Sequence, residues 1–402
     1  MVAIVQSNPY ACLSRKIGYS VGLENLLENV LSLAAIYVER RDVSFSNWRD
    51  LVVKKFERGE RAVLEIANFF GTLNLIKLMG RELHVLHALD SVAILRQYFK
   101  DDDAQYRRSV QFILLKGILE ADGDVFLNCV TANFEADATA KLLEEMVRWK
   151  WERLKHLFKN PAAQRPIWDI VSIRSQLGGT GHKDAKTSPF APRGGPSPFE
   201  PRRDPIDAAP SLVFEVAESY LRKILPTRKG WAKDLGLLAN SEVTTCARTI
   251  LMALPQIGIG VTGGPYYFWP YAIDLGPIRL SAKDLGIEPI SEWQVLKCLG
   301  ESVNSSVAPQ SGVADDDEAI IEQLAEFHTL YKAASASRGS IRHQLPLYIA
   351  QPLVVASAVA RQAKIPPLQE IIAKETHSAK RRLMIANIRG TEGGLVFHGV
   401  RT

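Results

Sequence analysis

A proline- and glycine-rich segment, Gly178 to Pro210, is the feature that most constrains how this 402-residue chain can fold. The segment holds seven prolines and five glycines. Proline lacks a backbone N–H and glycine weakens regular elements, so the segment cannot sustain a helix or a central strand. We therefore expect a linker over residues 178–210, between an N-terminal domain over 1–177 and a C-terminal part of similar size.

The composition is that of an ordinary globular protein, with 47% hydrophobic and 23% charged residues. The net charge of +5 permits a nucleic-acid partner through phosphate attraction but does not require one. Four scattered cysteines have no zinc-ligand spacing, which fits a reducing compartment. The N-terminus has no signal-peptide pattern, and the uncharged stretch Thr249 to Ile273 has too many prolines and glycines for a membrane helix. We expect a cytoplasmic protein with no membrane partner.

The segment from about residue 22 to 99 predicts three amphipathic helices followed by a β-hairpin. Apolar residues recur at helical spacing over Leu23 to Val38, then around Trp48, and again after Gly59, where Gly71 is expected to interrupt the third helix. Two short β-prone runs then flank a turn at Gly80.

Further helices are predicted up to the linker. Asp103 to Asn128 is expected to form one or two helices, with possible breaks at Gly117 and Gly123. Ala136 to Phe158 has the clearest amphipathic pattern in the chain.

After the linker, prolines and capping residues set the predicted boundaries. Pro226 is expected to end a helix that begins at Ser211, Ser241 to cap the next, and Pro352 to open a later one. Ser291 and Gln294 match a capping box. The predicted helices are Ser211–Leu225, Trp231–Leu237, Ser241–Leu254, one from Ser291, Asp315–Lys332, Leu353–Lys364 and Leu368–Glu375. The predicted hairpins lie within Ile257–Phe268 and on either side of the turn Arg389–Gly394.

This recurrent order of helices followed by a hairpin resembles winged helix-turn-helix proteins. The resemblance is to the fold, without a diagnostic motif of one family. It predicts a mainly α-helical protein with short β-hairpins and several winged-helix-like units. The units lie in the N-terminal domain, in a central domain over 211–335 and in a C-terminal unit over 336–402.

The chain contains no recognisable catalytic or cofactor motif. The chain lacks a phosphate-binding loop, a dinucleotide-binding glycine motif, a zinc-protease motif and a nucleophile elbow. Acidic runs such as Asp101–Asp103 precede predicted helices, where the helix dipole favours negative charge. We expect no catalytic residue, no metal and no cofactor.

Basic residues are the candidate nucleic-acid contacts. One group lies before and within the terminal hairpin, where a winged helix meets DNA, and a second lies in the linker. The candidates are Lys374, Lys380, Arg381, Arg382 and Arg389 in the first group, and Arg193, Arg202 and Arg203 in the second. The alternatives are a solvated charged face and a plain linker.

Three functions stay open. The first is a non-enzymatic protein that binds double-stranded DNA, in a prokaryotic multi-protein system such as a defence or mobile-element system. The second is a structural or adaptor subunit that uses winged helices to bind other protein subunits. The third is an enzyme, such as a nuclease, with an unrecognised motif.

Overall fold

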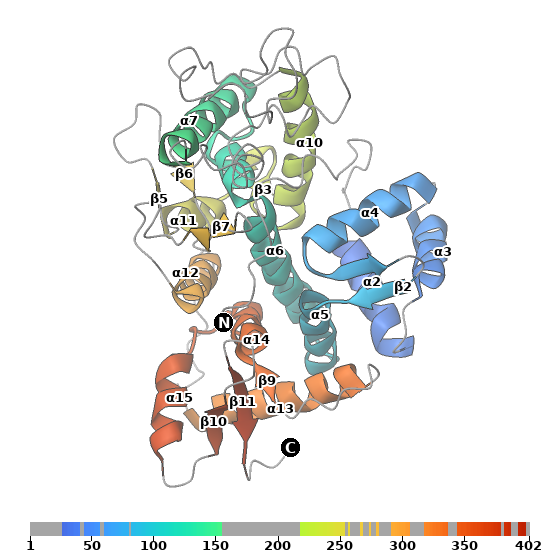
Figure 1. The fold of residues 1–402 in the computed structure, drawn as a ribbon, viewed down its shortest axis with the longest axis vertical. Coiled ribbons are helices and arrows are strands. Elements are labelled where there is room, and N and C mark those ends of the chain that lie inside the picture. The colour runs from blue at the N-terminus through green and yellow to red at the C-terminus, as the bar shows by residue number, and fades with distance from the viewer. Residues whose placement is uncertain are drawn as a thin grey trace.

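The computed structural model describes part of the chain, and the fold can be followed in Figure 1. The described residues are 26–40, 44–56, 60–79, 82–154, 218–253, 256–257, 266–267, 273–274, 279–280, 291–305, 317–336, 344–378, 382–386 and 393–398. The expected fold class is confirmed, because these residues are mainly helical and their strands form short antiparallel pairs. The predicted linker over 178–210 lies outside them, so the domain boundaries stay predictions.

The N-terminal segment has three helices followed by a hairpin, as predicted. The helices are α2 (Leu26–Arg40), α3 (Phe45–Phe56) and α4 (Glu60–Thr72), and the strands are β1 (Ile76–Met79) and β2 (Glu82–Val85). The strands pair antiparallel on either side of the predicted turn at Gly80, with Met79 opposite Glu82. Gly71 does not interrupt α4, which continues to Thr72. A Cβ on Gly71 would lie 3.3 Å from the carbonyl oxygen of Ile76, so glycine lets β1 approach the helix closely.

A long helix runs through the middle of the molecule (Figure 1). This helix, α6 (Asp103–Thr131), follows α5 (His87–Tyr98) and precedes α7 (Ala136–Leu154). The expected break at Gly117 is absent, since that residue continues the helix and faces Leu73. The break expected at Gly123 is found one residue earlier, at Asp122, whose φ of −145° and ψ of 19° kink the helix.

Helix α10 (Glu218–Asp234) corrects the prediction that Pro226 ends a helix, because the chain stays helical on both sides of that proline. An interior proline removes one backbone hydrogen bond and disfavours the helix by about 3 kcal/mol. Leu221 and Ile224 before it, and Trp231 and Ala232 after it, are all buried in one core. Burial of both halves outweighs that local penalty.

The start of helix α11 (Thr245–Ala253) is a second correction. Ser241, the expected cap, instead forms a two-residue turn with Asn240 between β3 (Leu238–Ala239) and β4 (Glu242–Val243). Both turn residues have positive φ, 50° and 66°, as a type I′ hairpin turn requires. The cap of α11 is Thr244, whose Oγ1 accepts a hydrogen bond from the Ala247 N–H at 3.3 Å.

Short strand pairs and one further helix lie between α11 and the C-terminal unit along the chain. The predicted hairpin within Ile257–Phe268 is confirmed, since β5 (Gln256–Ile257) pairs with β6 (Tyr266–Tyr267). Another pair joins β7 (Ile273–Asp274) and β8 (Arg279–Leu280). The capping box opens α12 (Glu292–Ser305): the Gln294 N–H donates to Ser291 Oγ at 3.2 Å, and the Ser291 N–H donates to Gln294 Oε1 at 2.9 Å.

In the described part of the predicted C-terminal unit over 336–402, two helices and a three-stranded sheet are found, and the helix at the end of the predicted central domain packs on the first of these helices and on the first strand. We therefore describe the three helices and the sheet together as the C-terminal unit. Its elements in chain order are α13 (Asp317–Ala336), β9 (Leu345–Pro346), α14 (Leu347–Ala360), α15 (Leu368–His377), β10 (Leu383–Ala386) and β11 (Gly394–Phe397). Strand β11 lies between β10 and β9, and both pairings are antiparallel. Pro352 does not open α14 but lies inside it. This helix is buried along most of its length, and its burial outweighs the local penalty of an interior proline. Pro367 caps α15, close to its predicted start.

Residues from both sides of the predicted linker share one continuous hydrophobic core. Helix α14 packs on α6, while α2 and α13 both pack on α5. The Tyr37 hydroxyl of α2 lies 3.1 Å from Asp90 Oδ1 on α5 and 3.0 Å from the Ala334 carbonyl oxygen on α13. Among the described residues, no helix combines the length and apolar character needed to cross a bilayer.

Candidate nucleic-acid interface

Helix α15 and the residue just before β10 carry the sequence-predicted basic residues that the structure describes. Leu368, Ile371 and Ile372 fix the helix to the core, and α15 packs against β10. Its opposite face is exposed. The exposed residues of α15 are Gln369, Glu370, Ala373, Lys374 and His377.

Lys374 lies on this exposed face and has an acidic partner. Its Nζ is 3.1 Å from Asp317 Oδ2, at the start of α13, and 62% of the lysine side chain remains exposed. An ion pair this exposed contributes little to stability, because water and salt screen it. The lysine can therefore exchange its carboxylate for another anion.

Arg382 is held more firmly. Its Nη2 lies 3.1 Å from Glu375 Oε1 on α15, its Nη1 contacts Glu318 on α13, and its side chain is only 19% exposed. The hydrogen bond to Glu375, with that to Glu318, raises the pKa of the guanidinium above its ordinary value. Arg382 thus connects α13, α15 and the start of β10.

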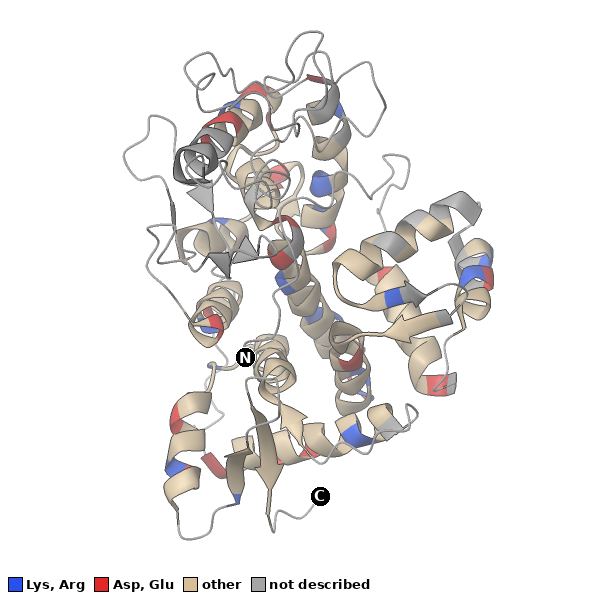
Figure 2. Cartoon of the chain, in the orientation of Figure 1, with Lys and Arg blue, Asp and Glu red and all other residues tan. Residues whose placement is uncertain are grey.

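Mixed charge is the main property of this surface. In Figure 2, red and blue positions lie close together on α13 and α15. The acidic partners of Lys374 and Arg382 are supplied by α13 and by α15 itself. Of the predicted contacts, Lys374 and Arg382 are thus brought within one cluster.

The remaining predicted contacts lie outside the described residues. They are Lys380, Arg381, Arg389, Arg193, Arg202 and Arg203. Their role in nucleic-acid binding stays a prediction.

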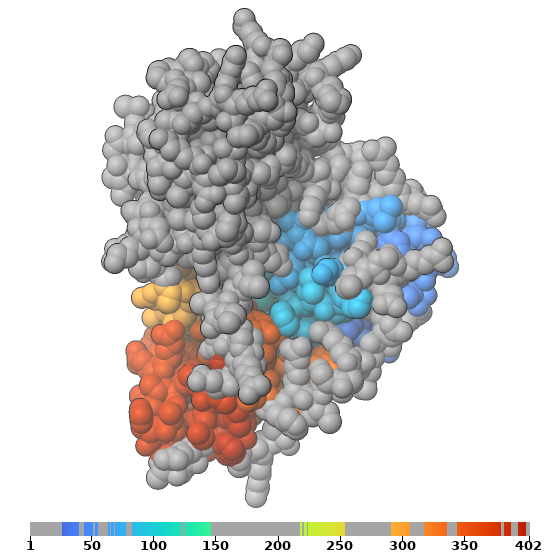
Figure 3. Space-filling view, in the orientation of Figure 1, coloured from blue at the N-terminus to red at the C-terminus, as the bar shows by residue number. Residues whose placement is uncertain are grey.

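A second exposed surface belongs to the N-terminal segment. Val53 and Lys54 on α3 are exposed, and so is Leu64 on α4. In the space-filling view of Figure 3, this segment (blue) and the C-terminal unit (orange to red) occupy separate parts of the face shown. The two segments therefore form separate surfaces on this face.

Within the part of the chain that the structure describes, no group of three or more His, Cys, Asp or Glu side chains is arranged to hold a metal ion. No family model, curated protein or solved structure matches this chain.

Proposed function

We propose that this protein binds double-stranded DNA through winged-helix-like units, mainly the C-terminal one, and acts without catalysis of its own. The supporting observation is the order of that unit: α13, β9, α14, α15, β10 and β11, with β11 between β10 and β9. This order is similar to that of a winged helix-turn-helix module, which supports the proposal. Helix α15 takes the place of the recognition helix, and the connection between β10 and β11 takes the place of the wing.

The chemistry of the exposed face of α15 supports the proposal. Gln369 can donate to and accept from an adenine edge, and Lys374 can donate to guanine or to a phosphate. Leu368 and Ile371 are buried on the opposite side, so they hold the exposed side chains at fixed positions along the helix. The N-terminal segment, with α2, α3, α4 and the β1–β2 hairpin, offers a second unit of similar order.

An electrophoretic mobility shift with generic duplex DNA over a salt series tests this proposal. We expect binding that weakens by orders of magnitude between roughly 50 and 200 mM salt. Combined replacement of Lys374, Lys380 and Arg381 by Ala should lower the slope of log affinity against log salt. The expected decrease is up to about 0.9 for each phosphate that the protein no longer neutralises.

Lys332→Ala is the matched control. Lys332 is exposed on α13, 15 residues and about 22 Å along the helix from Asp317, so its loss should leave binding unchanged. Absence of binding at low salt, or equal loss in the control, contradicts the proposal.

One observation favours the adaptor as a second candidate. Asp317, Glu318 and Glu375 already neutralise Lys374 and Arg382. Ile385, on the neighbouring strand β10, is 44% exposed. A nearly neutral surface with an exposed apolar side chain is typical of protein contacts. For this function, association with a partner subunit should be almost insensitive to salt and should weaken in Ile385→Asp.

A further inference from the structure

A cavity at the C-terminal end of α6 has the chemistry of a small-molecule site. Its volume is about 360 Å³, within the range of ligand pockets. Three elements far apart in sequence form its wall: the end of α6, strand β4 and helix α11. The lining residues are Val130, Thr131, Asn133, Glu242, Val243, Arg248 and Leu251.

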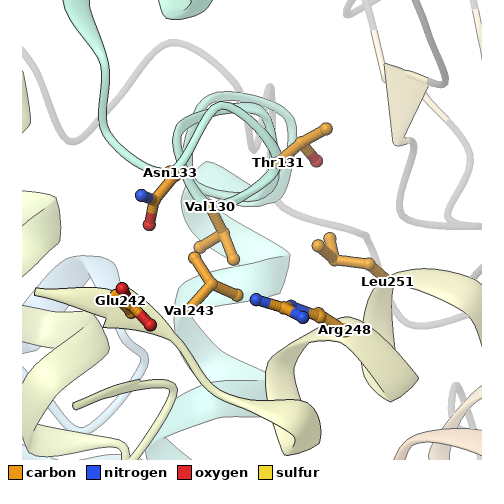
Figure 4. Close-up of a pocket in the computed structure, with 7 residues that line it drawn as sticks. All are labelled: Val130, Thr131, Asn133, Glu242, Val243, Arg248 and Leu251. Atoms are coloured by element: carbon orange, nitrogen blue, oxygen red, sulfur yellow. The ribbon is translucent and has the colours of Figure 1, made fainter.

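The cavity has an apolar surface between two opposite charges. Val130, Val243 and Leu251 supply the apolar part. Figure 4 shows Arg248 extending from α11 toward Val243, with Glu242 on the other side of that valine. Neither charged side chain has a hydrogen-bond or ion-pair partner within the described part of the chain, and both are exposed. Each is therefore available to a ligand.

Backbone geometry adds to the negative side of the cavity. Helix α6 ends at Thr131, so the negative end of its dipole lies at this cavity, although the carbonyls of residues 128–130 already accept N–H groups of the following turn. The following turn places Asn133 at positive φ, 49°, on the wall beside Glu242. A cation is thus favoured near Glu242 and the end of α6, while Arg248 favours an anion.

We propose that this cavity binds a small zwitterion with an apolar body, of the class of an aliphatic α-amino acid. The ligand carboxylate pairs with the Arg248 guanidinium, whose planar donors match a carboxylate. Its ammonium group lies toward Glu242 and the α6 carbonyl end. Its side chain covers Val130, Val243 and Leu251. This site is separate from the α15 surface and does not depend on the proposed DNA binding.

Isothermal titration calorimetry of the full chain with L-leucine tests the proposal. We expect saturable binding at one site, with a Kd of about 1 mM or below. Two analogues separate the charges: 4-methylpentanoate lacks the ammonium group, and 3-methylbutylamine lacks the carboxylate. Both should bind at least about tenfold more weakly than leucine.

Variants assign each charge to its residue. Arg248→Ala should weaken leucine and 4-methylpentanoate at least about tenfold, and Arg248→Lys should restore part of the loss. Glu242→Gln should weaken leucine but leave 4-methylpentanoate unchanged. Lys229→Ala, at an exposed lysine of α10 outside the cavity, is the control. Circular dichroism confirms that each variant is folded.

Two results would overturn the proposal. One is the absence of saturable leucine binding by the folded full chain. The other is leucine binding that Arg248→Ala and Glu242→Gln leave unchanged, because the ligand would then lie elsewhere.

Discussion

Arg228 and Asp122 form an ion pair inside the protein, with Arg228 Nη2 2.8 Å from Asp122 Oδ2 and both side chains 2% exposed. Asp122 is the residue at which α6 kinks, and Arg228 lies just after Pro226 in α10. The guanidinium also lies 5.0 Å from the centre of the Trp231 ring. The pair thus joins the two irregular points of α6 and α10.

Removing one partner of this pair should strongly destabilise the protein. Arg228→Met leaves the Asp122 carboxylate buried without its cation, and we expect the free energy of unfolding to fall by about 3–5 kcal/mol. The double variant with Asp122→Leu should be more stable than Arg228→Met alone, because no uncompensated charge remains. Urea denaturation measures both. Equal loss in the single and double variants would show that packing, not charge, determines the effect.

Gly300 of α12 should not tolerate a methyl group. An added Cβ would lie 2.6 Å from Val355 Cγ1 of α14 and 3.0 Å from Ile365 Cδ1. In a helix, alanine is more favourable than glycine by about 1 kcal/mol. Overpacking of a core, however, costs about 1–3 kcal/mol. We expect Gly300→Ala to lower the free energy of unfolding in urea. Gly230→Ala is the control, because an added Cβ there has no neighbour within 4 Å. It should be neutral or stabilising.

Asp234 should make stability depend on pH. Its Oδ2 accepts the Leu26 N–H at 2.7 Å, yet burial raises its pKa from 3.8 to about 6. The folded state therefore binds more protons than the unfolded state between about pH 4 and 6. The contribution of Asp234 to the free energy of unfolding is fully present below the pKa that this carboxyl has in the unfolded state. It is lost as pH rises through the pKa of the folded state.

The loss attributable to Asp234 between pH 4 and 6 should be about 1 kcal/mol, since the half-buried carboxyl is partly screened by solvent. Urea denaturation at the two pH values, compared with Asp234→Asn, isolates this contribution. Between pH 4 and 6, the free energy of unfolding of Asp234→Asn should fall by about 1 kcal/mol less than that of the unsubstituted protein. An identical pH profile for both proteins would contradict the assigned pKa.

Local sequence rules predicted the features that short-range chemistry determines. The hairpin around Gly80, the Ser291–Gln294 capping box and the helix start after Pro366 are examples. The rules were wrong at Pro226 and Pro352, where burial of both flanks outweighs a local penalty. Strand β9 was missed, because two residues carry no alternation and their partner in β11 lies about 50 positions later.

At the candidate interface, too, local sequence predicted some residues and only the packing of distant elements revealed others. Charge alone identified Lys374 and Arg382. Their partners Asp317 and Glu318 lie 57 and 64 positions away, beyond the reach of local sequence rules. Only the packing of α13 beside α15 and β10 reveals that these acids form ion pairs with the basic residues.

Cleavage within residues 178–210 should leave two fragments that stay together. The composition of this segment makes it the preferred protease site. The fragments share contacts between α2 and α10, α2 and α13, and α5 and α13, including Leu26 N–H to Asp234 and Tyr37 to Ala334. We expect limited trypsin digestion to give two bands on a denaturing gel but one peak in size-exclusion chromatography. Two separate peaks would support independent domains on either side of the linker.

The acidic residues of α13 should restrain DNA binding. Asp317 holds Lys374 at 3.1 Å, so a DNA phosphate must displace that carboxylate before it can pair with the lysine. Asp317→Asn removes the competitor and one negative charge near the phosphates. We expect affinity for generic duplex DNA to rise about 3- to 10-fold at low salt, and the salt slope to steepen by up to about 0.9. Glu322→Gln is the control, because it removes an exposed charge of the same helix that contacts neither basic residue. If Asp317→Asn and Glu322→Gln change affinity equally, the effect is one of overall charge, and α15 is not the DNA-contacting surface.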